Sequence, residues 1–139
     1  MKILAIFLAA LAIISMFLAM GSARSNGGEP EYRSTADGVY TEIQAKRGER
    51  LQRRACLRCH IPDYYKGGLL DAWLGNTVGA LNERIINTMP QDRPSSLKPR
   101  QYADIMAYIL KLNGFPAGQE RLPSDDSALA RIRIERSKK

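Results

Sequence analysis

The segment Cys56-Leu57-Arg58-Cys59-His60 contains both cysteines and the one histidine of this 139-residue chain. Two thiols three residues apart, followed directly by an imidazole, form the pattern by which a c-type haem is attached. The thiols add to the vinyl groups of the porphyrin, and the imidazole binds the iron. On a helical turn, residues three apart share a face, so both sulfurs can reach the ring edge while His60 points to its centre. The segment therefore predicts one covalent haem c, attached through Cys56 and Cys59, with iron bound by His60.

Three other interpretations of this segment are open. A thioredoxin-like redox couple needs a strand–helix–strand setting, whereas the flanking sequence is typical of helices. A structural zinc site needs four ligands, and the chain has no further Cys or His to complete one. A fortuitous match without any role is disfavoured for the same reason, because no other Cys or His occurs anywhere in the chain.

The N-terminus has the composition of an export signal. An apolar run from Ile3 to Met20 follows one lysine and precedes the small residues Gly21-Ser22-Ala23, which suit a signal peptidase. Residues 1–23 are therefore predicted to be a signal peptide. The run exceeds the usual signal core of about 7 to 15 residues, so an uncleaved anchor that keeps the protein in contact with the membrane is the alternative. Both interpretations place the remainder in the periplasm.

The rest of the chain divides into three parts by composition. Residues 24–37 are rich in Gly, Ser, Glu and Pro and predict a flexible lead. Residues 38–118 predict one folded domain, and 119–139 predict a C-terminal extension in which Ile132 and Ile134 lie in a short strand or an extended segment. A domain of roughly 80 residues is small enough that a buried cofactor would supply much of its packing.

The first helix of the domain begins at a predicted capping box. The pattern Thr41-Glu42-Ile43-Gln44 pairs the Thr hydroxyl and the Gln side chain with free backbone donors. The helix then runs to the cysteine segment with an apolar stripe of Ile43, Gly48, Leu51 and Ala55. Its opposite face is basic and consists of Lys46, Arg47, Arg50, Arg53, Arg54 and Arg58.

The sequence after His60 predicts two further helices and no sheet, so the fold class is all-α. Ile61 to Gly68 reads as a loop, and Leu69 to Leu74 as one helical turn that contains Trp73. Apolar residues spaced by three and four predict a helix from Val78 that ends at Met89-Pro90. Pro99 begins the third helix, and Gly114 ends it in the left-handed conformation. Its apolar face consists of Tyr102, Ile105, Met106, Ile109 and Leu110.

The second iron ligand is sought among two methionines, Met89 and Met106, which follow the export signal. Met106 lies on the apolar face of the third helix and is interpreted as a core residue. Met89 lies at a helix end beside Pro90, where helical packing gives it no role. A stiff loop that presents its thioether to iron accounts for this position, so Met89 is predicted to be the second ligand.

Together these segments resemble a class I monohaem cytochrome c over Gly38 to about Gly118. The resemblance implies three main helices and short helical turns around one haem, with the first and last helices crossing at Gly48 and Tyr108. It also implies that Trp73 packs at the haem pocket, although an ordinary core position is the alternative. The segments 89–94 and 113–118 are similar to those of small cytochromes that accompany periplasmic quinoprotein dehydrogenases.

The chain departs from the family pattern after the haem histidine. Ile61 stands where Gly is common, and the stretch 67–71 lacks the Pro whose carbonyl accepts the ring N–H of the histidine. Pro62 is the candidate replacement. The group that orients His60, and with it the fine tuning of the iron, is left open by the sequence.

The function expected from these features is electron transfer without catalysis. With iron bound by His60 and Met89, no substrate can approach it, and the chain would carry electrons from a periplasmic donor, such as a quinoprotein dehydrogenase, to a terminal oxidase. The net charge of +7 and the basic helix face favour acidic partners, or else form an ordinary solvated surface. The alternatives are a haem enzyme or gas sensor with a labile sixth ligand, and a thiol–disulfide oxidoreductase. Nucleic-acid binding is disfavoured because no base-reading motif is present.

Overall fold

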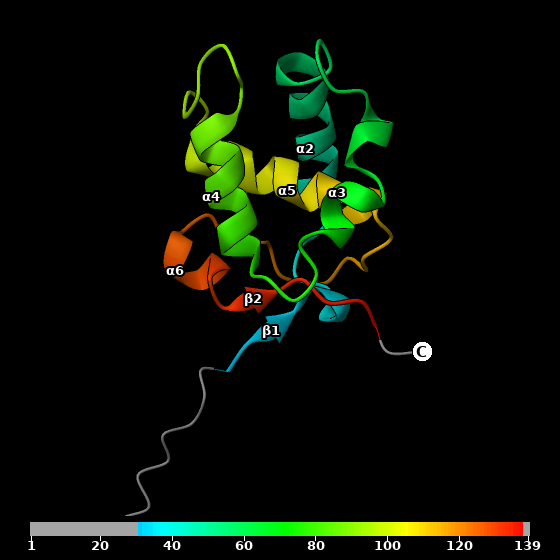
Figure 1. The fold of residues 1–139 in the computed structure, drawn as a ribbon. Helices are drawn as coiled ribbons and strands as arrows, with labels where there is room; N and C mark the ends of the chain where they lie inside the picture. The colour runs from blue at the N-terminus through cyan, green and yellow to red at the C-terminus, as the bar shows by residue number, and fades with distance from the viewer. Residues whose placement is uncertain (1–30, 138–139) are drawn as a thin grey trace, which may run out of the picture.

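The computed structural model describes residues 31–137, which are mostly helical, as predicted (Figure 1). The elements in chain order are β1 (Arg33–Ser34), the 3-10 helix η1 (Thr35–Asp37), α2 (Glu42–Ala55), the 3-10 helix η2 (Pro62–Tyr65), α3 (Gly68–Asp71), α4 (Val78–Thr88), α5 (Pro99–Leu112), α6 (Asp126–Leu129) and β2 (Ile132–Arg133). The predicted signal peptide, 1–23, lies outside the described residues. Within 31–137 no helix has the length and apolar character needed to cross a membrane.

Helix α5 is the centre of the fold. Figure 1 shows it crossing the molecule, with α2 and α4 packed against it. Pro99 occupies its first turn, where a missing N–H costs nothing, and Gly114 follows its end with φ of +77°, as predicted. Every residue from Tyr102 to Leu110 is buried, so the whole middle of the helix is enclosed rather than one face. Met106 is only 1% exposed and is a core residue, as predicted.

Helices α2 and α5 cross at Gly48, and their backbones touch there. A Cβ atom at Gly48 would lie 1.8 Å from the carbonyl oxygen of Asp104 and 2.9 Å from the Cβ atom of Tyr108. The predicted contact of Gly48 with Tyr108 is therefore present. Beside it, the Arg47 guanidinium donates to both carboxylate oxygens of the buried Asp104, at 2.9 and 3.1 Å, and this bidentate pair ties the two helices together.

The buried face of α2 differs from the predicted apolar stripe. Ile43 is 69% exposed, and the buried residues are Gln44, Ala45, Gly48 and Gln52. Gly48 of the predicted stripe is buried and Leu51 packs on the core, whereas the inclusion of Ile43 was wrong. The two glutamines were missed because the prediction took apolar character as the sign of burial, and both are buried with hydrogen bonds to backbone. Only half of the predicted capping box forms, because the Gln44 side chain is used elsewhere. The Thr41 hydroxyl accepts from the Gln44 N–H, but the Gln44 side chain bonds to both backbone groups of Leu122.

The two ends of the described chain form a small parallel sheet. Figure 1 shows β1 and β2 side by side beneath the helices, with Arg33 opposite Ile132. The Thr35 hydroxyl donates to the Glu135 carbonyl and accepts from the Glu135 N–H. The part of the expected flexible lead that the structure describes is thus held in place. Composition did not indicate this, because the contacts are hydrogen bonds of the backbone and of the Thr35 hydroxyl, which need no apolar side chain.

The C-terminal extension packs on the helices and completes the core. It contributes the short helix α6, which lies against α4, and its apolar residues Leu122, Leu129, Ile132 and Ile134 are all buried. The tail that the sequence left undecided includes a two-residue strand, Ile132–Arg133. The hydrophobic core therefore extends beyond residue 118, because the extension covers apolar surface that the helices leave open.

Gly48→Ala should destabilise the protein by about 2–3 kcal/mol or more, because the new methyl group overlaps the Asp104 backbone and forces α2 from α5. Chemical denaturation measures the loss. The matched control is Gly68→Ala in α3, where a Cβ atom meets no other atom within 4 Å and stability should change by less than about 1 kcal/mol. Equal effects of the two substitutions would contradict the close crossing.

Candidate cofactor-binding site

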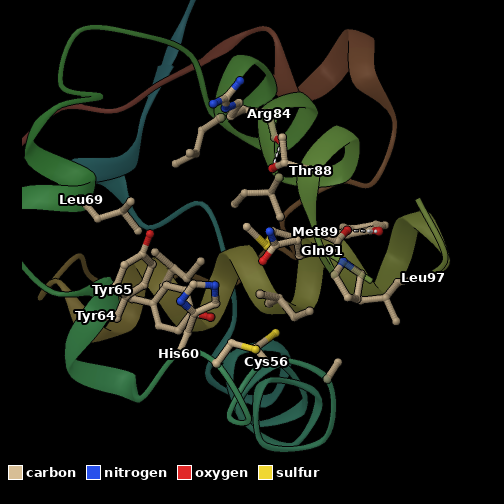
Figure 2. Close-up of a pocket in the computed structure, with 18 of the residues that line it drawn as sticks. Cys56, His60, Tyr64, Tyr65, Leu69, Arg84, Thr88, Met89, Gln91 and Leu97 are labelled. Carbon is tan, nitrogen blue, oxygen red and sulfur yellow. Dashed lines mark hydrogen bonds between the residues drawn. The ribbon is translucent and has the colours of Figure 1, made fainter. Parts of the chain in front are cut away.

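A cavity of about 720 Å³ opens between α2, α4 and α5, within the roughly 300–1,000 Å³ typical of cofactor sites. Two separate segments bring the predicted site residues to it: Cys56, Cys59 and His60 follow α2, and Met89 follows α4. Figure 2 shows Cys56, His60 and Met89 around this one space. The structure therefore brings together all four residues that the sequence singled out.

The cysteine segment continues α2 by one hydrogen-bonded turn. The N–H groups of Cys56 and Leu57 donate to the Gln52 carbonyl at 2.8 and 2.9 Å, and those of Cys59 and His60 donate to the Cys56 carbonyl at 3.0 and 2.8 Å. No disulfide joins the two cysteines; Cys59 is exposed and Cys56 is half-buried. Burial raises the pKa of the Cys56 thiol, and the neighbouring Cys59 adds to that rise while a contact with Tyr65 opposes it.

Two tyrosines surround the His60 imidazole. The His60 and Tyr64 rings stack with centroids 4.3 Å apart and planes 27° from parallel, and the Tyr65 ring meets His60 edge-on at 6.0 Å. Both tyrosines belong to η2, in the stretch that was predicted to be a loop. Among residues 31–137 no hydrogen bond joins the His60 ring to Pro62, so the expected replacement partner is not found.

Met89 is fixed through its backbone at the end of α4. Its N–H donates to the Ile85 carbonyl at 2.8 Å, and its carbonyl accepts from the Tyr102 hydroxyl at 2.8 Å. Tyr102 is 3% exposed and belongs to the central helix α5. The Met89–Pro90 peptide bond is cis. A loop methionine is therefore held at the cavity by a hydrogen bond from the core.

The cavity walls are mainly apolar, which suits a flat hydrophobic ring. They include Leu69, Trp73, Leu81, Ile85, Leu97, Ile105 and Ile109. Trp73 is half-buried; it lines the cavity and also packs on the core. It therefore occupies both of the positions considered for it, at the pocket and in the core. Apolar walls exclude water and strengthen any electrostatic interaction inside the site.

Charged residues lie at the rim. Arg58 and Asp92 form an exposed ion pair at 3.1 Å that joins the cysteine segment to the loop after Met89. The basic face predicted on α2 is reduced, since Arg47 is engaged by Asp104 and Arg53 by Glu49. The same helix also exposes the side chains of Lys46, Arg50 and Arg54 to solvent.

The donor set fits a c-type haem better than a bare metal ion. Two thiols can anchor a porphyrin, and an imidazole and a thioether from different segments are suitable iron ligands. In residues 31–137 the His, Cys, Asp and Glu side chains form no group of three or more that could hold a metal ion. Comparison with known protein families, with curated proteins and with solved structures finds no match to this chain. The interpretation of the site therefore rests on its donor set and cavity.

Sequence reasoning overlooked three polar contributors to the site. Gln52 and Tyr65 lie beneath the cysteine segment, and Tyr102 holds Met89. One signal was readable: Gln44, Gly48, Gln52 and Cys56 recur every four residues and therefore share a helix face. Nothing local to Tyr102 reveals its bond to Met89, because the two meet only through the packing of α5 on α4.

Tyr102→Phe should lower the free energy of unfolding by about 1–2 kcal/mol, because the Met89 carbonyl loses its donor while the ring still fills its place. Denaturant unfolding measures this loss. Tyr108→Phe on the same helix is the control, since the Tyr108 hydroxyl has no hydrogen bond within 31–137, and a change below about 0.5 kcal/mol is expected. A larger loss for Tyr108→Phe would refute the role of the Tyr102 bond.

Proposed function

We propose that the protein is an electron carrier with one covalently attached haem c, resembling a class I monohaem cytochrome c. The observation that carries this proposal is the arrangement of Cys56, Cys59, His60 and Met89 around one apolar cavity. The close crossing of α2 and α5 at Gly48 supports the resemblance. When bound, the haem supplies reversible one-electron exchange between ferric and ferrous iron.

Each of the four residues has a distinct role in this proposal. Cys56 and Cys59 hold the cofactor covalently, and His60 and Met89 hold the iron. The Met89 thioether is a soft donor, which favours the lower oxidation state and raises the reduction potential. The apolar walls act in the same direction, because a medium of low polarity disfavours additional positive charge.

With His60 and Met89 both bound to the iron, no position would be left for a substrate, so the haem would exchange electrons with other proteins rather than catalyse a reaction. We propose that the carrier works in the periplasm between a donor, such as a quinoprotein dehydrogenase, and a terminal oxidase. The exposed cations on α2 support acidic partner surfaces, since opposite charges speed encounter. The chain has no second histidine that could serve as a distal catalytic group.

The decisive experiment is production of the full chain in a host that exports proteins and matures c-type cytochromes. The purified protein should carry the mass of one haem after denaturation, show a haem absorption spectrum and retain its pigment in acid–acetone. The control is the double variant Cys56→Ser/Cys59→Ser, which should lose covalent attachment. A colourless wild-type protein, or one whose pigment is extracted by acid–acetone, would sink the proposal.

Met89→Ala should open the iron to external ligands, so the reduced variant binds carbon monoxide whereas the wild type does not. Its potential should fall by roughly 0.1–0.2 V, within the range of about 0.8 V that axial ligands span. Difference spectra and redox titration give both values. Met106→Leu is the matched control, because the buried Met106 does not line the cavity and its loss should leave the iron closed. Unchanged ligand binding in Met89→Ala would reject Met89 as the ligand.

A further inference from the structure

Gln52 forms three hydrogen bonds to the cysteine segment. Its backbone carbonyl accepts from the N–H groups of Cys56 and Leu57 at 2.8 and 2.9 Å. Its side-chain Nε2 donates to the backbone carbonyl of His60 at 2.7 Å. One residue of α2 therefore holds both the beginning and the end of the pentapeptide that contains the attachment residues.

The side chain of Gln52 is fully buried and only partly satisfied. It has 0% exposure, and its Oε1 atom has no hydrogen-bond partner within the described chain. A buried amide oxygen without a partner costs free energy that Leu or Met at this position would avoid. The Nε2 atom of the same side chain does have an acceptor, the His60 carbonyl, and this hydrogen bond accounts for a polar side chain at this buried position.

A second polar group packs against the same spot. The buried Tyr65 lies beside both the Gln52 side chain and the Cys56 thiol, and its ring meets the His60 ring edge-on at 6.0 Å. Gln52 of α2 and Tyr65 of η2 thus pack against the same part of the cysteine segment. The tyrosines thus contact the ring of His60, and Gln52 holds its backbone.

We infer that Gln52 is a positioning residue that sets the direction in which His60 presents its imidazole to the iron. This inference rests on the proposed function. This hydrogen bond holds the peptide plane after His60, and the bond from the His60 N–H to the Cys56 carbonyl holds the plane before it. Together the two bonds set the direction of the Cα–Cβ bond that leads to the ring. Groups that orient a metal ligand tune the metal as well as its affinity, so loss of the bond changes the reduction potential.

The test uses Gln52→Met in the complete haem-carrying protein, because Met has nearly the shape of Gln and lacks its donor. We expect a changed potential and amide hydrogen exchange at Cys59 and His60 that is faster by on the order of tenfold relative to α5. Gln44→Met is the matched control. Gln44 is equally buried on the same helix, but its side chain bonds to Leu122, so the variant should lose stability and keep the wild-type potential.

The outcomes separate this inference from the proposed function. A wild-type protein without covalent haem overturns both. A pigmented wild type with an unchanged potential in Gln52→Met, or an equal shift in Gln44→Met, overturns the positioning role alone. Should Gln52→Met not accumulate, Gln52→Asn keeps the amide but shortens its reach, and it must show the same shift in potential and exchange; wild-type values there overturn the inference.

Discussion

The fold depends on the absence of a side chain at Gly48. Because no Cβ atom separates the two backbones, α2 lies directly on α5 at Asp104, and the bidentate bond from Arg47 holds this approach. The end of α2 is thereby placed over the central helix, where Cys56 meets the apolar wall that includes Ile105. A wider separation of these helices would move the cysteine segment away from Met89 and enlarge the cavity between them.

Two polar side chains occupy the buried face of α2, one on each side of the crossing at Gly48. Gln44 and Gln52 extend from this face to backbone groups, at Leu122 on one side and at His60 on the other. Buried glutamine thus connects the helical core to the two irregular segments that the core alone does not hold.

Much of the fold could be predicted from local signals in the sequence. Pro99 and Gly114 delimit α5 because each has a backbone constraint that acts without tertiary contacts, and Pro90 likewise follows the end of α4. The four candidate site residues were predicted from type and spacing, and the structure brings them to one cavity. The burial of Gln52 and exposure of Ile43 could not be read in this way, because hydropathy does not register a hydrogen bond made across the fold.

The pairing of β1 with β2 was equally hidden, since two-residue strands have no detectable alternation. Its strength lies in backbone groups and in the Thr35 hydroxyl, which bonds to a residue one hundred positions further along the chain. The hydrogen bond of Tyr102 to Met89 is hidden for a related reason, because only the packing of two helices brings the groups together. Local sequence therefore predicted the candidate ligands but not the groups that hold them.

The parallel pairing of β1 with β2 also determines an order of events during synthesis. Thr35 precedes its partner Glu135 by 100 positions, so their mutual hydrogen bonds can form only after the residues between them have been synthesised. Cys56 and Cys59 emerge long before this closure, while the C-terminal segment is still absent. The cysteine segment is thus synthesised, and open to contact, before the pairing of β1 with β2 closes the base of the helices.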